Sequence, residues 1–304
     1  ILNTCAVRAK PQQRVYSRLG DLRSLRRERP GMIIVVAGCV AEIDAAELSA
    51  RGADIVVGPR HYDELAARLG ARLRGEAPSA QPCQLVGDGD RAPAEGLPAV
   101  RTSHLRAFVN IIYGCDNWCA YCIVPQARGR ECSRRPEDIL AEVEQLAAQG
   151  VRDITLLGQN VNSYGRDLEG GIDFPQLLRL VDAVPGVERV RFTTSHPKDL
   201  TEELIAAMAS LPSVCEHLHL PLQAGSDRVL RAMGRGYTYA HFRALAAAAR
   251  RAIPGLAVTT DVMVGFPGET EEDFEQTLRA FEELRFDQAF MFKYNDRPGT
   301  RAAQ

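Results

Sequence analysis

Three cysteines stand close together in the middle of the chain. Cys115, Cys119 and Cys122 form a CxxxCxxC pattern in the stretch YGCDNWCAYCI, directly after an expected strand. Thiols at this spacing indicate metal or cluster chemistry in a reducing compartment, rather than disulfides. A structural zinc site needs a fourth ligand, and neither Cys132 nor His104 is well placed to supply it. The pattern therefore favours a 4Fe–4S cluster with one open iron, with zinc or three buried small side chains as alternatives.

The five other cysteines are scattered along the chain. Cys5 in Asn-Thr-Cys and Cys39 in Ala-Gly-Cys each stand beside an expected strand or helix start. Taken alone, either one would be interpreted as a buried hydrophobic side chain. Cys83, Cys132 and Cys215 match no ligand pattern, and we interpret them as incidental.

The composition describes an ordinary globular protein of two domains. The 304 residues are 45% hydrophobic and 25% charged, with a formal net charge of −2. This near balance argues against a general polyanion binder but allows a local RNA-binding face. No apolar run approaches the ~18 residues of a membrane span. Because the chain begins at Ile1 without a signal-peptide pattern, we expect an interior fragment of a cytoplasmic protein.

The elements that position these cysteines fall into two units. Residues 1–74 predict a small α/β domain, and residues 75–104, rich in Pro and Gly, predict a linker. From residue 105 to 304, strands alternate with helices, which predicts a parallel sheet, either doubly wound or an incomplete barrel. Active residues should then follow the carboxyl ends of the strands. The strands are expected at 108–112, 153–157, 189–193, 216–220, 257–264 and 287–292, and the helices at 136–149, 174–184, 201–210, 241–252 and 271–284.

Nearly the whole chain resembles one family, the tRNA methylthiotransferases of the radical S-adenosylmethionine (SAM) superfamily. The resemblance implies an α/β fold in which a small N-terminal methylthiotransferase domain precedes a partial (β/α)6 TIM-like barrel. The matching segments are ILNTCAVRAKPQQRVYSRLG at 1–20, VVAGCVAE at 35–42, VNIIYGCDNWCAYCIVPQARGRECSR at 109–134, LLGQNVNSYG at 156–165, RFTTSHP at 191–197, HLPLQAGSDRVLRAMGRGYT at 219–238, VGFPGET at 264–270 and RPGTRAA at 297–303.

The resemblance implies a role for each matching position. Cys115, Cys119 and Cys122 would hold the cluster that cleaves SAM to a 5′-deoxyadenosyl radical. Other strand-end residues would contact SAM, although Tyr121 can also be interpreted as a core tyrosine. These implied SAM contacts are Tyr121, Gln159, Asn160, Ser195, Gln223 and Gly268.

The family also carries a second 4Fe–4S cluster, from which the methylthio group is delivered. Cys5 and Cys39 would be two of its three ligands, and the third belongs to a motif upstream of this sequence. We therefore expect the second cluster, and a C-terminal RNA-binding β-barrel, only in a full-length parent.

Arginines beside the cysteine loop are candidates for RNA phosphate contacts. Arg128, Arg130, Arg134 and Arg135 follow the loop, where a target base would enter. A second basic group on the first helix is equally well explained as a solvated helix face.

The resemblance implies an enzyme that converts isopentenyl-adenosine beside the tRNA anticodon to its 2-methylthio form with two SAM molecules. Its partners would be tRNA, an electron donor such as flavodoxin or ferredoxin, and a sulfur source, with no membrane. Two alternatives remain: methylthiolation of a ribosomal-protein aspartate or of threonylcarbamoyl-adenosine in tRNA, and a non-catalytic iron–sulfur or RNA-binding module.

Overall fold

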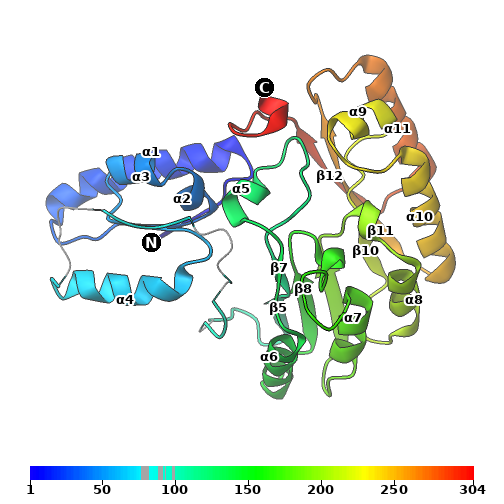
Figure 1. Ribbon diagram of the computed structural model, residues 1–304, viewed down its shortest axis with the longest axis horizontal. Helices are drawn as coiled ribbons and strands as arrows, with labels where there is room; N and C mark the ends of the chain where they lie inside the picture. Colours follow the sequence, from blue (N-terminus) through cyan, green and yellow to red (C-terminus); the bar gives the residue numbers. More distant parts are fainter. Residues whose placement is uncertain (77–81, 88–91, 93, 98–99) are drawn as a thin grey trace.

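Figure 1 shows two lobes joined side by side, the first from the N-terminal part of the chain and the second from the remainder. The structure is a computed structural model, and it describes residues 1–76, 82–87, 92, 94–97 and 100–304. No helix among the described residues is long and apolar enough to cross a membrane.

The N-terminal lobe is a four-stranded parallel sheet covered by helices. In chain order its elements are β1 (Leu2–Thr4), α1 (Ala9–Glu28), β2 (Val35–Gly38), α2 (Cys39–Ile43), α3 (Ala45–Ala50), β3 (Ile55–Val57), α4 (Tyr62–Leu73) and β4 (Cys83–Leu85). Strands β2 and β3 are buried along their whole length, as expected of parallel strands with both faces covered. Figure 1 accordingly shows α1, α2 and α3 on one side of the sheet and α4 on the other.

The structure places a strand inside the segment that the sequence predicts to be a linker. Strand β4 pairs in parallel with β3, from Ile55 opposite Cys83 to Val57 opposite Leu85. Three residues are too few to give a hydrophobic period, so this strand is defined by its partner rather than by its own pattern. Residues 77–81, 88–91, 93 and 98–99 of the predicted linker lie outside the described residues.

The second lobe contains two three-stranded parallel sheets, β5-β8-β9 and β10-β11-β12. Their strands are β5 (Arg106–Asn110), β8 (Asp153–Leu157), β9 (Arg189–Thr193), β10 (His217–His219), β11 (Ala257–Val264) and β12 (Gln288–Lys293). A single parallel bridge, Val190 to Val214, joins β9 to the segment before β10. The incomplete barrel is therefore confirmed, with a break between its two halves where β10 is short.

Helices alternate with these strands and pack on the outside of the sheets (Figure 1). They are α6 (Pro136–Ala148), α7 (Phe174–Asp182), α8 (Glu202–Ser210), α9 (Asp227–Ala232), α10 (Tyr239–Ala252) and α11 (Glu271–Leu284). Helix α11 begins with a capping box between Thr270 and Asp273, which satisfies backbone N–H groups of its first turn. Helix α9 is not foreseen from the sequence, because six residues contain less than two full turns.

A small hairpin and one short helix frame the cysteine loop. Strands β6 (Ile112–Tyr113) and β7 (Cys132–Ser133) pair antiparallel, and α5 (Val124–Arg128) lies between them in sequence. Helix α2 of the N-terminal lobe packs against α5, and Ile123 and Ala127 are buried in the N-terminal core. The two lobes therefore share a core immediately after the third cysteine of the loop.

Candidate iron–sulfur and SAM site

The cysteine loop leaves the barrel at Gly114 and is fixed by backbone contacts. Gly114 has φ +73°, and a Cβ there would lie 1.9 Å from the carbonyl oxygen of Arg130, so only glycine fits. The Cys115 N–H donates to the Gly129 carbonyl at 3.2 Å, and the Cys122 N–H donates to the Cys119 carbonyl at 3.0 Å. These two bonds hold the CxxxCxxC segment in a folded loop directly after β6.

The three thiols lie close enough to influence one another. The pKa of Cys115 is raised to about 12, mainly by burial, with smaller contributions from nearby Glu131, Cys122 and Cys119. Burial also raises the pKa of Cys122 to about 11. Buried thiols of this kind ionise when a cationic centre binds them.

The donor set fits an iron–sulfur cluster. Within the described parts of the chain, no group of three His, Cys, Asp or Glu side chains is gathered for a single metal ion. Three cysteine sulfurs on one loop form a soft ligand set, which suits the several irons of a cluster. Cys132, the alternative fourth zinc ligand, lies on β7.

Buried polar atoms without partners line the carboxyl ends of β8 and β9. Gln159 Oε1 and Asn160 Oδ1 follow β8, and Thr194 Oγ1 and Ser195 Oγ follow β9; none has a hydrogen-bond partner among the described residues. A buried unsatisfied polar group costs about 1–3 kcal/mol, so several at one sheet edge indicate a place for a polar ligand. Thr194 is not foreseen from the sequence, although it belongs to the RFTTSHP segment.

The second half-barrel adds a similar group of atoms beyond β11 and β12. Glu269 Oε1, Tyr294 OH and Arg297 Nε are buried and have no partner within the described structure. Gln223 is buried with φ +71°, and its backbone bridges to Val262 of β11. Its position is therefore fixed by the sheet.

Gly268 lies in the loop after β11 with φ +79°. Apart from Gly268 and its two chain neighbours, no atom of the described residues lies within 4 Å of the position that a Cβ would take, so space is open beside this backbone. Tyr121 packs partly buried against the main core, and its hydroxyl accepts from Arg235 Nη1 at 3.4 Å. A SAM contact and a core role therefore both remain compatible with its position.

A residue that the sequence analysis does not single out lies under the loop. The guanidinium of Arg235 donates from Nη1 to Cys119 Sγ at 3.2 Å, and the residue is 5% exposed. Only its place in the matching segment MGRGYT points to it, because residue type alone predicts an exposed arginine.

Arg134, one of the four arginines expected to bind RNA, is buried, and its charge is already paired. Arg134 forms ion pairs with Glu95 at 2.6 Å and Glu142 at 2.8 Å, and its side chain is 7% exposed. The sequence places a cation there, but its neighbours in the fold neutralise it. Arg130 is exposed and pairs with Asp116.

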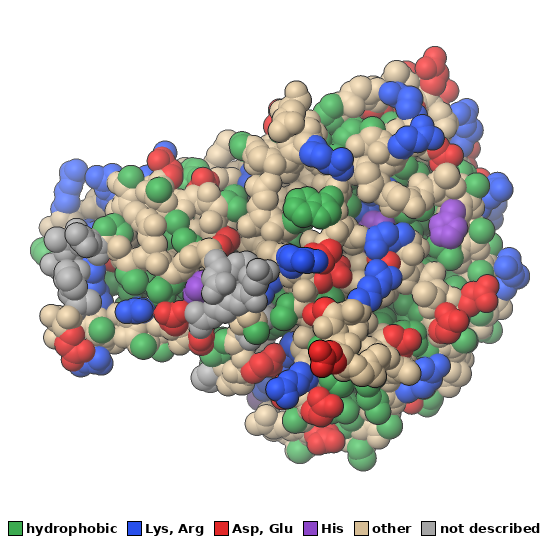
Figure 2. Space-filling view, in the orientation of Figure 1, with side chains coloured by type: hydrophobic (Ala, Val, Ile, Leu, Met, Phe, Trp, Pro, Cys, Tyr) green, Lys and Arg blue, Asp and Glu red, His purple; other side chains and the backbone are tan. Residues whose placement is uncertain are grey.

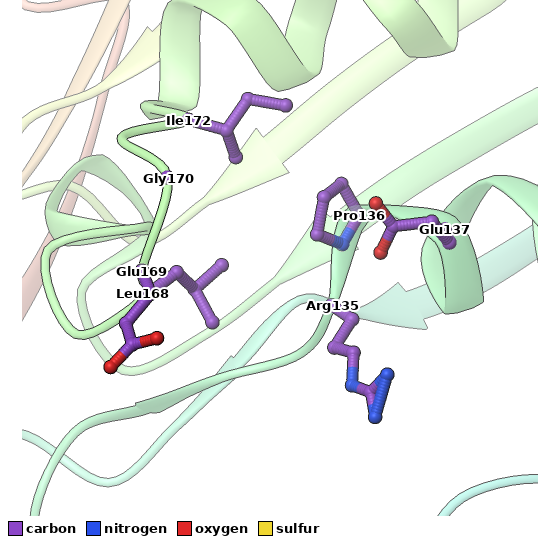
Figure 3. Close-up of a pocket in the computed structure, with 7 residues that line it drawn as sticks. All are labelled: Arg135, Pro136, Glu137, Leu168, Glu169, Gly170 and Ile172. Carbon is purple, nitrogen blue, oxygen red and sulfur yellow. The ribbon is translucent and has the colours of Figure 1, made fainter.

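The other candidates remain accessible. Arg135 is exposed and Arg128 is partly buried. Arg135 lines a pocket of about 440 Å³, and Figure 3 shows residues 135–137 on one side of it and 168–172 on the other. Figure 2 shows Lys and Arg side chains across the middle of the visible face, over the inner part of the barrel lobe.

The two N-terminal cysteines follow neighbouring strands. Cys5 comes directly after β1 and is exposed, whereas Cys39 comes directly after β2 and is buried. A Cβ on Gly38 would lie 2.4 Å from the carbonyl oxygen of Thr4, so the Asn-Thr-Cys and Ala-Gly-Cys segments touch. The structure therefore brings the two segments together at one edge of the sheet.

This edge faces the barrel lobe. A pocket of about 140 Å³ lies between the lobes, lined by Glu42, Pro59 and Arg60 on one side and by residues 125–129 on the other. Arg60 is buried and donates to the carbonyl oxygens of Arg128 and Arg130 at 3.0 and 2.8 Å. The N-terminal lobe thereby holds the segment that follows the cysteine loop.

Two family models match the chain. Residues 109–281 match the radical SAM superfamily, and residues 1–58 match a family described as the uncharacterized protein family UPF0004. In fold, the chain is similar to the radical SAM methyltransferase TsrM from Kitasatospora setae, with a TM-score of 0.71 at 19% identity over 100% of this chain and 64% of that one. It is also similar to the cobalamin-dependent radical SAM enzyme OxsB, with a TM-score of 0.66 at 13% identity over 99% of this chain and 45% of that one.

Curated relatives match along the whole sequence. The chain is 49% identical to a tRNA-2-methylthio-N(6)-dimethylallyladenosine synthase of Caldicellulosiruptor saccharolyticus, over 100% of this chain and 64% of that protein. It is 46% identical to the synthase of the same name from Syntrophomonas wolfei, over 100% of this chain and 68% of that protein. The chain thus spans about two thirds of the length of these relatives. The expected family is confirmed: the chain belongs to the radical SAM superfamily, in the same family as these synthases.

Proposed function

We propose that the protein containing this chain is a tRNA methylthiotransferase that converts N6-dimethylallyl-adenosine, beside the anticodon, to its 2-methylthio derivative. The observation that carries the proposal is the 49% identity along the entire chain to a synthase named for that product. The match covers the entire chain, so it extends through both lobes. A tRNA substrate implies that the enzyme acts in the cytoplasm.

In this proposal the barrel lobe binds the SAM-cleaving cluster and SAM. Cys115, Cys119 and Cys122 hold a 4Fe–4S cluster, and the unpartnered groups of Asn160 and Ser195 receive polar atoms of SAM. When bound, the cluster supplies the electron that cleaves SAM. The remaining SAM contacts are assigned to Tyr121, Gln159, Gln223 and Gly268.

The N-terminal lobe supplies the second cluster in the full protein. Cys5 and Cys39 are assigned as two of its ligands, supported by the contact between Gly38 and Thr4 that brings their segments together. We assign residues 1–74 to this domain, 75–104 to the connection and 105–304 to the radical SAM domain. Strand β4 extends the sheet of the first domain into the connection.

Three partners complete the reaction. The first is tRNA, for which the exposed Arg130 and Arg135 are candidate phosphate contacts. The others are an electron donor, such as flavodoxin or ferredoxin, and a sulfur source. The target base must leave its stack to reach the barrel, as in other enzymes that modify bases.

The test uses the full-length parent and tRNA from cells that lack it. Purified enzyme with SAM, a reductant and sulfide should produce 2-methylthio-dimethylallyl-adenosine, detected by nucleoside mass spectrometry. Transcripts without the dimethylallyl group serve as the control and should remain unmodified. Modification of a ribosomal protein, or of threonylcarbamoyl-adenosine instead, would contradict the assigned substrate.

A further inference from the structure

Arg235 is a buried cation without a carboxylate partner among the described residues. It is 5% exposed, and no Asp or Glu of the described chain lies within ion-pair distance of its guanidinium. Its side chain donates to Cys119 Sγ, to the hydroxyls of Tyr121 and Tyr237, and to the Pro221 carbonyl at distances between 3.1 and 3.4 Å. A buried charge without a counter-charge is strongly unfavourable, so this environment calls for a negative group.

Of these contacts, the Cys119 sulfur is the group suited to provide that charge. The Pro221 carbonyl and the hydroxyls of Tyr121 and Tyr237 are neutral hydrogen-bond partners. A cysteine that binds iron is a thiolate. Arg235 is therefore matched to a metal-bound Cys119.

The backbone around Arg235 is shaped to hold the guanidinium in this place. Gly234 and Gly236, on either side, have φ values of +71° and +69°, which glycine adopts without strain. The Met233 carbonyl accepts from the Ala120 N–H at 2.8 Å, so this turn is attached to the cysteine loop by a backbone bond. The cysteine loop is therefore attached to this turn by a bond that does not depend on the Arg235 side chain.

We propose that Arg235 is a positioning residue that holds the Cys119 sulfur and stabilises the reduced state of the cluster. The inference rests on the proposed function, in which the cysteine loop carries a 4Fe–4S cluster. One-electron reduction adds one negative charge to the cluster, and a fixed positive charge beside one of its sulfurs favours that added charge. Hydrogen bonds to cluster sulfurs and nearby charge are recognised determinants of such potentials.

The test is a reductive titration of the anaerobically reconstituted 304-residue chain, followed by electron paramagnetic resonance. Arg235→Gln should lower the reduced-to-oxidised ratio at a fixed potential at least tenfold, equivalent to about 59 mV for one electron. Arg235→Lys retains the charge and should lose less than half of that shift. Arg231→Gln is the matched control, because Arg231 is exposed and lies four residues away.

The outcomes separate this inference from the proposed function. Wild-type chain with no 4Fe–4S signal would overturn the proposed function and the inference with it. A wild-type cluster with an unchanged potential in Arg235→Gln would overturn the inference alone. If Arg235→Gln binds no cluster, retention of the cluster in Arg235→Lys supports the role of the charge. Loss in both variants, with unchanged thermal unfolding of the apo chain, contradicts it.

Discussion

The two groups of cysteines differ in how the fold holds them. Cys115, Cys119 and Cys122 lie on one loop. This loop is held by backbone hydrogen bonds and by Arg235, and the N-terminal lobe holds the segment that follows it. Cys5 and Cys39 instead follow two separate strands, and Cys5 is exposed. The first set is local in sequence and enclosed, whereas the second depends on the pairing of strands distant in sequence. Under the proposed assignment, the loop therefore contains its ligand set within eight residues, while the N-terminal edge would require further groups to complete a cluster.

The largest expected difference between the two groups is in cluster binding. Cys119→Ala should abolish the cluster and SAM cleavage in this chain, because two thiolates remain for a site that needs three. Cys5→Ala should leave both within about twofold of wild type, because the N-terminal edge is separate from the loop. The measurements are iron content, expected to be about four per chain in wild type, and 5′-deoxyadenosine formation.

Equal loss in the two variants would contradict the separation of the sites. Cys215→Ala is a further control, since Cys215 lies before β10 and outside both groups. Its iron content should match that of wild type.

The next effect concerns the supports of the loop. Arg134 follows β7 and is paired with Glu95 and Glu142, whereas Arg130 is 78% exposed. Removing one partner of a buried ion pair costs about 3–5 kcal/mol, and since both glutamates are partly exposed we expect about 2 kcal/mol for Arg134→Met. Arg130→Met should cost less than about 0.5 kcal/mol. Urea unfolding measures both, and equal stabilities would show that the Arg134 pairs contribute little.

A smaller effect comes from His196, after β9. Burial, with Arg235 and then Lys198 nearby, lowers the pKa of His196 to about 2, from the ordinary histidine value of about 6.5. The unfolded chain therefore takes up a proton below about pH 6.5 while the folded chain does not, so this group makes folding less stable as pH falls. Between about pH 7.5 and 5.5 the loss is about 1.4 kcal/mol.

His196→Gln should remove that part of the pH dependence of unfolding. His241→Gln is the control, because His241 is exposed on α10 and its replacement should leave the dependence unchanged. An identical pH slope in wild type and His196→Gln would contradict the expected contribution.

The differences between sequence and structure have a common physical cause. Strands β8, β9 and β11 match their predicted bounds. Their apolar and β-branched runs are typical of buried strands, so the local sequence is sufficient to predict them. The CxxxCxxC pattern is also recognisable in the sequence, because its three cysteines lie close together along the chain. Strand β4 is not, because its pairing partner defines it.

Charged residues are the hardest to place. Arg134 and Arg235 are both buried, one between carboxylates and one under a cysteine, and nothing in their sequence positions separates them from the exposed Arg130. Residue type predicts solvent exposure for all three. Only tertiary neighbours determine which arginine neutralises a carboxylate, which supports a ligand and which can meet RNA.

The smallest expected effect is a difference in tRNA binding between the arginines near the cysteine loop and those on the N-terminal helix. Arg130 and Arg135 are exposed and follow the cysteine loop in sequence, and Arg14 and Arg27 are also exposed, on α1. Each phosphate contact contributes about 0.7–0.9 to the slope of log affinity against log salt concentration. Arg130→Glu with Arg135→Glu should therefore flatten the slope for tRNA binding by about one to two units. Arg14→Glu with Arg27→Glu applies the same charge change and should leave the slope intact if α1 is only a solvated face.

SAM cleavage without RNA should survive in both double variants. Equal flattening of the slope in the two double variants would show that the RNA-binding face extends across both lobes. A larger flattening in the α1 variant would show that this face lies away from the cysteine loop.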